Sequence, residues 1–340
     1  MKIAISGLNN TDNPAPGIPV AKSLKDEYSL VGLSYDPNEP GVYQGLFEKV
    51  YLMPYPTLGY EEFKKRITEI KQKSGIDVII PNLDAELPLY IKYQNDIEKL
   101  GIKTYLPSLE CFEMRDKSKL PEFSKKIGVK HPKTIEIVSL DDLIKATKEL
   151  GFPVMIKGNY YKAYKAFNLD EAVEFYYKIS NEWGFPLLAQ EVISGHEINF
   201  VGIADGERVI AGVGMKKLTI TELGKVWSGV SIKNSALFEA SKKFVETAGW
   251  RGAFEFEAMS NGKDIYLIEI NPRFPAWVYF ATMLGINLPK IMIDLLNGKK
   301  VNENFEYPVE KMYIRYTDET TVDFNKFSTL ISKKELRIES

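Results

Sequence analysis

Hydrophobic and polar positions in the first third of the chain predict strands that alternate with helices. Short runs of aliphatic and β-branched residues predict buried strands at 2–6, 29–35, 76–81 and 103–106. Apolar residues at helical spacing predict helices at 18–28, 61–74 and 87–100. Strands and helices in this order form a parallel sheet with right-handed crossovers.

The remainder of the chain is typical of an α+β region. Helices are expected at 118–127, 140–150, 170–179, 236–248 and 287–297, and strands at 152–158, 187–193, 199–204, 209–216 and 307–316. The polar stretch 218–230 is expected to be a loop, and the charged tail 333–340 to be peripheral. We therefore expect three units, at 1–110, 111–195 and 196–340.

The clearest local pattern is a β-hairpin whose turn lies at 260–264. Centring the turn on Gly262 places Phe254 opposite Ile270 and makes one face of the hairpin wholly apolar. On the other face Glu255 then lies opposite Glu269. A two-residue Asn-Gly turn would shift the pairing by one residue and lose every apolar match, so we predict the first register.

That register predicts a cation, because two carboxylates about 5 Å apart on one sheet face repel each other. Mg²⁺ binds one or two carboxylates and completes its shell with water and substrate phosphates. Asn271 continues the same face, and Arg273 just beyond it offers a forked donor to an anion. A solvated outer face on an ordinary hairpin is the alternative. We prefer that alternative for Glu257.

Composition limits the class of protein. The chain has 340 residues, 44% hydrophobic and 26% charged, with a net charge of −2, as in a soluble globular protein of two or three packed units. There is no basic bias for nucleic acid and no apolar run long enough to cross a bilayer. The N-terminus does not resemble a signal peptide, and a single cysteine fits the cytoplasm. Because the chain has only two histidines, we do not expect a histidine-based metal site or a histidine-dependent catalytic triad.

Polar residues follow two strands of the N-terminal unit, at the edge where parallel sheets bind ligands. Asn10 follows the first strand, and Asp84 and Glu86 follow the strand at 76–81. We expect these three side chains to contact the substrate, and the two carboxylates favour a cationic or amino-bearing one. Ordinary loop and helix-cap chemistry is an equal alternative. The glycine fingerprint of a dinucleotide site is absent.

Five motifs, by their order and spacing, resemble those of the ATP-grasp carboxylate–amine ligases, a superfamily that includes biotin carboxylase, carbamoyl-phosphate synthetase and D-alanine–D-alanine ligase. They are Arg-Asp-Lys at 115–117, Pro-Val-Met-Ile-Lys at 153–157, Gln-Glu-Val-Ile-Ser-Gly-His-Glu at 190–197, Phe-Glu-Phe at 254–256 and Leu-Ile-Glu-Ile-Asn-Pro-Arg at 267–273. The resemblance covers residues 115 to about 296, and 1–106 is similar to the N-terminal domain of the family. It implies an α/β and α+β fold, in which an N-terminal parallel-sheet domain precedes a two-lobed ATP-grasp domain.

The resemblance also implies a role for individual residues. ATP phosphates would be held by Lys117 and Lys157, adenine by Gln190, Glu191, Val192 and Ile193, ribose by Glu197, magnesium by Glu255, Glu269 and Asn271, and the acyl phosphate by Arg273, with Lys216 near the phosphates. The cofactors implied are ATP and Mg²⁺, with Mn²⁺ as an alternative ion.

One segment departs from the family pattern. The second lysine is usually followed by a glycine-rich loop over the phosphates, whereas 158–166 contains one glycine, three tyrosines and two lysines. Main-chain N–H groups need glycine to cradle phosphate in this way. Either Lys162 or Lys165 substitutes by charge, or the loop packs on its aromatic residues and ATP is held weakly.

The expected function is therefore that of a cytoplasmic ATP-dependent carbon–nitrogen ligase. A small-molecule carboxylate would be activated as an acyl phosphate, and an amine would displace the phosphate. One alternative is bicarbonate activation, as in biotin carboxylase or carbamoyl-phosphate synthetase. Another is a non-catalytic nucleotide-binding or regulatory protein. Neither nucleic acid nor a membrane is an expected partner, and a homodimer is the commonest closed assembly.

Overall fold

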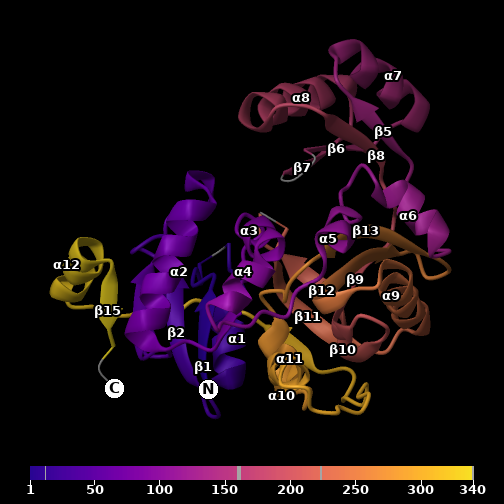
Figure 1. Ribbon diagram of the computed structural model, residues 1–340. Helices are drawn as coiled ribbons and strands as arrows, with labels where there is room; N and C mark the ends of the chain where they lie inside the picture. Colours follow the sequence, from indigo (N-terminus) through magenta and orange to yellow (C-terminus); the bar gives the residue numbers. More distant parts are fainter. Residues whose placement is uncertain (12, 159–161, 223, 339–340) are drawn as a thin grey trace.

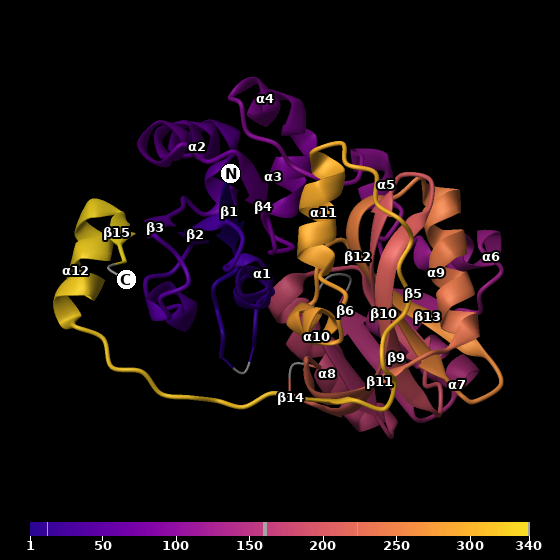
Figure 2. The ribbon, with the colours of Figure 1, turned by 90° about the horizontal axis from the view of Figure 1, so that it is seen from below.

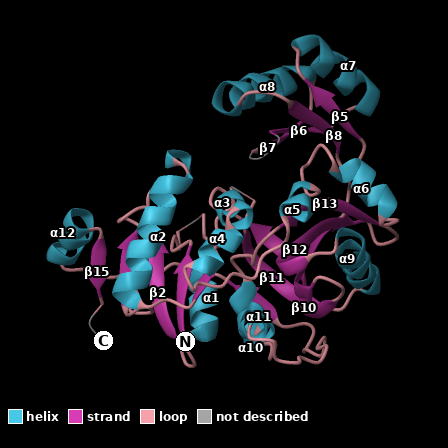
Figure 3. Cartoon of the chain, in the orientation of Figure 1, coloured by secondary structure: helices cyan, strands magenta, loops and turns pink. Residues whose placement is uncertain are grey.

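The computed structural model describes residues 1–11, 13–158, 162–222 and 224–338, and in these ranges the chain forms three β-sheets (Figure 1). One sheet is mostly parallel and lies in the N-terminal domain, and the other two are antiparallel. In the view coloured by secondary structure, helices flank each sheet (Figure 3). The predicted combination of a parallel-sheet domain and a two-lobed α+β domain is confirmed.

The N-terminal sheet has both faces covered, which explains its almost wholly apolar strands. Its parallel strands are β1 (Lys2–Ser6), β2 (Ser29–Ser34), β3 (Lys49–Leu52) and β4 (Val78–Ile80). Its helices are α1 (Gly17–Leu24), α2 (Tyr60–Ser74), α3 (Leu87–Lys92) and α4 (Gln94–Lys99), with 3₁₀ turns at Pro40–Tyr43 and Pro56–Leu58. The helix expected at 87–100 is thus two helices that meet at Tyr93.

The C-terminal segment completes this sheet, so the prediction of a peripheral tail was wrong. After α12 (Phe324–Lys333), β15 (Glu335–Arg337) pairs antiparallel with β3. Arg66 on α2 donates hydrogen bonds to the carbonyl oxygens of Leu52 and Lys334, and Leu336 is buried. Figure 2 shows the chain leaving β14 (Met312–Ile314) and running along the outside of the molecule to reach this strand.

The largest sheet is antiparallel, and its two faces differ. Its strands are β9 (His196–Asp205), β10 (Val209–Ile220), β11 (Val226–Ile232), β12 (Arg251–Ser260) and β13 (Ile265–Asn271), with β14 at the edge. Phe200, Phe254 and Phe256 pack under α9 (Ser235–Ala248). The opposite face packs at one end against α10 (Val278–Met283), α11 (Leu288–Leu296) and the N-terminal domain.

The loop expected at 218–230 is mostly strand. β10 continues to Ile220, and β11 begins at Val226. These strand ends are partly exposed, so they do not need the apolar residues by which buried strands are recognised. Because this stretch contains polar residues and glycines, its sequence did not predict the pairing of β10 with β11.

The hairpin of β12 and β13 forms as expected, but its register differs by two residues. Glu255 lies opposite Asn271, and Glu257 lies opposite Glu269. A bulge after Glu257 brings Ala258 opposite Leu267, and four residues form the turn. Beyond the bulge the shift is an even number, so Phe256 and Ile270 stay on the apolar face. Between the bulge and the turn the shift is one residue, so Leu267 takes the place predicted for Tyr266 on that face. The opposed carboxylates are therefore Glu257 and Glu269, not the predicted Glu255 and Glu269.

The third sheet belongs to a small lobe that stands above the large sheet in Figure 1. It contains β5 (Thr134–Ile137), β8 (Leu187–Glu191), β6 (Val154–Gly158) and β7 (Ala163–Ala166), packed on α7 (Leu140–Leu150) and α8 (Leu169–Trp183). The predicted loop at 158–166 includes β7, while 159–161 lie outside the described residues.

The segment that follows the N-terminal domain packs on the large sheet before the chain enters the small lobe. Helices α5 (Leu109–Glu113) and α6 (Leu120–Lys126) place Cys111, Leu120 and Phe123 in the core under α9. The four strands of the small lobe come from 134–191. Over the ranges that the structure describes, no helix is both long and apolar enough to cross a membrane.

We expect Leu336→Ala to lower the free energy of unfolding by about 2–3 kcal/mol, because it removes a buried side chain and leaves a cavity. The neighbouring Arg337 is exposed, and Arg337→Ala should change stability by no more than about 0.5 kcal/mol. Urea unfolding followed by circular dichroism measures both. Equal effects of the two substitutions would show that β15 is not part of the core.

Candidate functional site

Polar side chains gather on one face of the large sheet, opposite α9, because they occupy alternate positions on four neighbouring strands. They are Glu197 and Asn199 on β9, Lys217 on β10, Glu255 and Glu257 on β12, and Glu269 and Asn271 on β13. The ammonium of Lys217 contacts the carboxylate of Glu197 and lies 3.3 Å from that of Glu257. Its side chain is only 7% exposed, and lysine is rarely so buried unless paired.

Lys217 and the surrounding carboxylates determine each other's charge. Burial opposes the charge on Lys217, but Glu257, Glu197 and Glu255 outweigh it and raise the pKa of Lys217. Burial likewise opposes ionisation of Glu257, yet Lys217 prevails and lowers the pKa of Glu257 to about 2. For Glu197, burial outweighs Lys217 and raises the pKa to about 7. Glu257 is therefore the carboxylate that stays ionised at neutral pH.

Glu255 is an internal anchor on this face. Its Oε1 accepts hydrogen bonds from Asn199 Nδ2 at 2.8 Å and Trp277 Nε1 at 2.7 Å, and its Oε2 accepts one from Asn271 Nδ2 at 3.0 Å. Burial, and then the charge of Glu257, raise the pKa of Glu255 to about 7. With both oxygens occupied by protein donors, Glu255 orients its neighbours.

The carboxylate pair that fits a magnesium ion is Glu257 and Glu269. They lie opposite each other, and Asn271 uses its amide N–H groups on Glu255 and Glu257, which leaves its carbonyl oxygen for a ligand. No group of three histidine, cysteine, aspartate or glutamate side chains among the described residues could hold a metal. Magnesium suits two carboxylates, because it takes its other ligands from water and phosphate. The solvated face expected for Glu257 was wrong.

Two lysines approach these carboxylates from outside the sheet. Lys117 lies 3.5 Å from Glu269 Oε1. Lys157, the penultimate residue of β6 in the small lobe, donates to Gln190 Oε1, and Gln190 Nε2 donates to Thr134 Oγ1 at 2.8 Å. Burial, and then repulsion from Lys117, lower the pKa of Lys157 to about 8, although Glu269 and other carboxylates oppose this. The structure thus brings both predicted phosphate lysines to one place.

The other residues predicted for nucleotide binding lie where the small lobe meets the large sheet. Gln190 is buried and holds Lys157. The N–H of Glu191 is bonded to the Lys133 carbonyl. Val192 and Ile193, both half-buried, follow β8 and lead into β9, so they form the connection between the lobes.

The structure favours Lys217 over the predicted Lys216. Lys216 pairs with Ile198, whose side chain packs in the core under α9. Successive residues of a strand point to opposite faces. Lys216 therefore faces away from the carboxylates, and Lys217 faces them. The sequence offered two adjacent lysines, and only the pairing of β10 with β9 distinguishes them.

Arg273 joins the large sheet to the N-terminal domain. Its Nη2 and Nε donate to Asp84 Oδ2 at 2.8 and 3.1 Å. Burial opposes the charge on Asp84, but Arg273, and then Arg115 and Lys225, lower its pKa. Asp84 Oδ1 is buried and has no hydrogen-bond partner among the described residues. The arginine expected at the acyl phosphate is thus held beside the site by an ion pair.

The other substrate residues are differently placed from the prediction. Glu86 is fully buried, and it accepts hydrogen bonds from the hydroxyls of Ser6 and Tyr35 and from the N–H groups of Asn82 and Leu83. Such a carboxylate cannot reach a substrate, so this prediction was wrong. Asn10 Oδ1 accepts from Arg315 Nη1 at 3.3 Å. Since Asp84 is paired with Arg273, the argument for a cationic substrate no longer holds.

Comparison with known proteins gives a family match for part of the chain and two groups of similar proteins. Residues 185–320 match the family described as ATP-grasp in the biosynthetic pathway with Ter operon. The carbamoyl phosphate synthase large chain of Clostridium botulinum (strain Kyoto / Type A2) is 26% identical over 274 residues, which are 75% of this chain and 24% of that relative. The large chain from Clostridium acetobutylicum is 24% identical over 233 residues, 63% of this chain and 21% of the relative. This chain thus spans less than a quarter of these relatives.

Solved structures share the fold at low sequence identity. The N5-carboxyaminoimidazole ribonucleotide synthetase of Thermus thermophilus has a TM-score of 0.67 at 13% identity, over 91% of this chain and 81% of that one. The biotin carboxylase domain of Hydrogenobacter thermophilus 2-oxoglutarate carboxylase was solved as a dimer with MgADP and bicarbonate. Its TM-score is 0.66 at 18% sequence identity, over 88% of this chain and 70% of that one. The L-amino acid ligase of Bacillus licheniformis has a TM-score of 0.65 at 16% sequence identity, over 87% of this chain and 74% of that one. The chain has the ATP-grasp fold, and the resemblance shown by its five motifs is confirmed.

We expect Lys217→Met to lower the free energy of unfolding at pH 7 by about 3–5 kcal/mol, because it leaves buried carboxylates without their cation. Lys216→Met, on the opposite face, is the matched control and should cost about 1 kcal/mol or less. Urea denaturation measures both.

The pH dependence of stability should differ between the two proteins below pH 4.5. In the wild type, the lowered pKa of Glu257 contributes stability above its ordinary value of 4.5 that is lost as the pH falls towards 2. In Lys217→Met, burial no longer has Lys217 against it, so the loss of stability below pH 4.5 should disappear. The fall in stability above pH 4.5, which Glu197 and Glu255 already cause in the wild type, should become steeper. An unchanged pH profile in Lys217→Met would contradict the assignment.

Proposed function

We propose that the protein is an ATP-dependent ligase that activates a small-molecule carboxylate as an acyl phosphate and joins it to an amine. The observation that carries this proposal is the convergence of Lys117 and Lys157 on the opposed carboxylates Glu257 and Glu269. Two cations over a carboxylate pair suit the phosphates and the magnesium ion of MgATP. The fold shared with an L-amino acid ligase supports the same chemistry.

We assign each part of the nucleotide to residues of this arrangement. Lys117 and Lys157 would hold the phosphates, and Val192 and Ile193, on the connection between the lobes, would contact the base. Glu197, at the start of β9, would take the ribose hydroxyls. Glu257, Glu269 and the Asn271 carbonyl would hold the metal. When bound, magnesium would neutralise phosphate charge as it develops.

Arg273 and Lys217 would act on the reacting groups. Arg273 presents a guanidinium beside the site and would orient the substrate carboxylate. A carboxylate oxygen attacks the γ-phosphorus, the bond to the ADP oxygen breaks, and Lys217 stabilises the charge on the transferred group. The amine nitrogen then attacks the acyl carbon, phosphate leaves, and the amine gives up a proton. The small lobe would exclude water, which otherwise hydrolyses the acyl phosphate.

Bicarbonate activation is the second candidate function. The curated relatives are carbamoyl phosphate synthase large chains, and the biotin carboxylase domain was solved with MgADP and bicarbonate. A guanidinium such as that of Arg273 binds bicarbonate and a carboxylate equally well. A non-catalytic nucleotide-binding protein is the third candidate. The cytoplasmic location, Mn²⁺ as a second ion and a homodimer stay predictions.

We expect the wild type to bind MgATP at micromolar strength, and Glu269→Ala and Glu257→Ala each to lose at least tenfold of that affinity, as loss of a metal-site group typically does. The loss should be confined to measurements with magnesium. Asp264→Asn, in the turn of the same hairpin, is a control that should bind normally. Isothermal titration calorimetry with and without magnesium measures this. Absence of MgATP binding in the wild type would contradict the proposal.

ADP release distinguishes the candidate functions. A carboxylate–amine ligase should release ADP only when both an acid and an amine are present, whereas bicarbonate activation should depend on bicarbonate. Binding of MgATP without ADP release under either condition would favour the non-catalytic alternative. Screening pairs of acids and amines by coupled ADP detection therefore tests the amine requirement directly.

The affinity for MgATP should fall as the pH rises above 8, because Lys157 has its pKa lowered to about 8 and only its charged form attracts phosphate. Lys157→Arg keeps its charge and should remove this dependence. The folding stability of the protein without nucleotide should depend on pH in the opposite direction. The unfolded chain binds more protons between pH 8 and 10.5, so this residue makes stability rise over that range. Calorimetric titration at several pH values measures the affinity, and equal slopes in both proteins would contradict the role of Lys157.

A further inference from the structure

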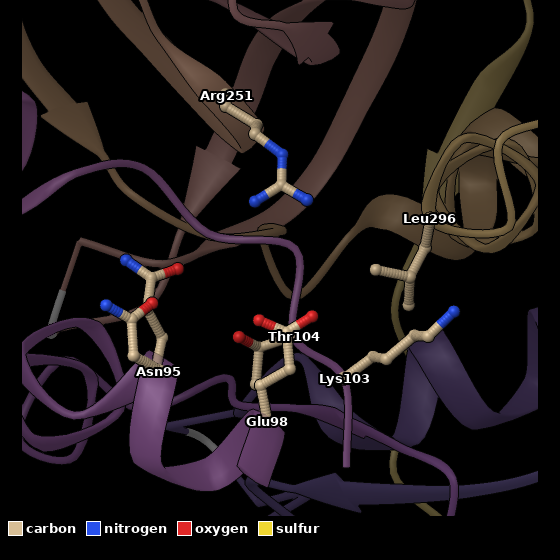
Figure 4. Close-up of a pocket in the computed structure, with 7 residues that line it drawn as sticks. Asn95, Glu98, Lys103, Thr104, Arg251 and Leu296 are labelled. Carbon is tan, nitrogen blue, oxygen red and sulfur yellow. The ribbon is translucent and has the colours of Figure 1, made fainter. Parts of the chain in front are cut away.

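A second cavity, of about 250 Å³, lies outside the site described above (Figure 4). Its walls come from α4, from the segment that follows α4, from the first residue of β12 and from the end of α11. It therefore lies between the N-terminal domain and the large sheet. On β12, Arg251 is four residues before Glu255, or about 13 Å along the strand.

The lining of this cavity is almost wholly polar and carries three charges. Glu98, Lys103 and Arg251 supply the charges, Asn95 and Thr104 supply hydrogen-bonding groups, and Leu296 is the apolar contact. In Figure 4 the Arg251 guanidinium points into the hollow from one side, and Glu98 and Asn95 lie on the other. Lys103 reaches along the edge towards Leu296. The lining has a net charge of +1.

None of these three charges is neutralised by an ion pair. The salt bridges found among the described residues include neither Glu98, Lys103 nor Arg251. In contrast, Lys99, the residue after Glu98, is paired with Asp96 at 2.8 Å. Arg251 is half-buried, whereas Glu98 and Lys103 are exposed, so all three charges are available to a ligand but solvent screens the last two.

Arg251 is held in place before any ligand binds. Its guanidinium lies over the Tyr105 ring, 4.1 Å from the centroid. Gly252 has φ +113°, and a Cβ there would lie 2.9 Å from the Tyr105 carbonyl oxygen. Only glycine allows this approach of the two backbones. A preorganised guanidinium loses less side-chain entropy when it binds a carboxylate.

We propose that this cavity binds an acidic amino acid. Arg251 would take the α-carboxylate, Glu98 the ammonium and Lys103 the side-chain carboxylate, so a ligand of net charge −1 complements a lining of +1. The volume lies just below the range of roughly 300–1,000 Å³ for drug-sized ligands, which suits a smaller molecule. Glutamate and aspartate have the required three charges.

Because the cavity lies between the N-terminal domain and β12, a bound ligand would stabilise the contact between them. Tyr105, which supports Arg251, also lines a small crevice together with Ala253 and Arg273. A ligand that fixes Arg251 against Tyr105 would therefore stabilise the contact between the N-terminal domain and the strand that leads to Arg273. Binding to the folded state alone raises thermal stability.

Calorimetry of the full-length protein with L-glutamate, L-glutamine and glutarate tests the proposal. L-glutamate should bind at millimolar strength or better and raise the unfolding temperature. L-glutamine lacks the second carboxylate and glutarate lacks the ammonium, so each should bind at least about threefold more weakly, as for partly exposed charge pairs. Absence of L-glutamate binding at millimolar concentration would overturn the proposal.

Substitutions locate the binding. Arg251→Gln should reduce L-glutamate affinity at least tenfold, Glu98→Gln should remove the preference for L-glutamate over glutarate, and Lys103→Gln should remove the preference over L-glutamine. Lys99→Gln, on the same helix, is the matched control and should bind as the wild type. If Arg251→Gln does not fold, Glu98→Gln and Lys103→Gln still decide the question.

The test is independent of the proposed ligase activity, since its readout is binding. L-glutamate could instead bind as a substrate beside Arg273. In that case Arg273→Gln would abolish binding, while Arg251→Gln, Glu98→Gln and Lys103→Gln would leave it unchanged. This outcome would overturn the proposal for the second cavity without contradicting the proposed function.

Discussion

The candidate site depends on one buried cation, Lys217, among the carboxylates of Glu197, Glu255 and Glu257. Carboxylates this close cannot all ionise without a positive charge, so the sheet face would otherwise be destabilised by its own residues. Lys217 keeps Glu257 charged, while Asn199, Trp277 and Asn271 satisfy Glu255. The result is a polar surface on which the ionised Glu257 lies opposite Glu269.

Three parts of the chain meet at this surface, and each is held by a polar contact. The small lobe contributes Lys157, which Gln190 positions. The N-terminal domain contributes Asp84, which forms an ion pair with Arg273. The large sheet contributes the carboxylates. The site is therefore complete only when the small lobe, the N-terminal domain and the large sheet are all in place.

One strand, β12, contributes residues to both the candidate active site and the second cavity. Alternate residues of a strand share a face, so Arg251, Ala253, Glu255 and Glu257 all point to the same side of the large sheet. Glu255 and Glu257 belong to the candidate active site, and Arg251 belongs to the second cavity. Ala253, between them, is small and buried, which lets the N-terminal domain pack closely against the strand. Strand periodicity thus places two polar regions on either side of an apolar contact.

The sequence by itself determined the elements and the chemical groups. The periodic pattern identified the parallel N-terminal domain, the helix at 140–150 and the hairpin, because local spacing of apolar residues reports which face is buried. Lys157, Glu269, Asn271 and Arg273 stand out as polar residues within or beside apolar runs, whereas Lys117 was predicted only from the motif resemblance. The edge strand β15 was missed, because a three-residue strand has almost no local pattern.

Tertiary structure decided which of two neighbouring candidates faces the site. A four-residue turn and a bulge, each adding one residue, together shift the hairpin by two residues and put Glu257, not Glu255, opposite Glu269. Pairing with β9 selects Lys217 over Lys216. Burial removes Glu86 from reach, and Arg273 neutralises Asp84. Each of these outcomes depends on which distant segment packs alongside. Local sequence periodicity reports the alternation of faces but not the partner, register or charge that each face meets.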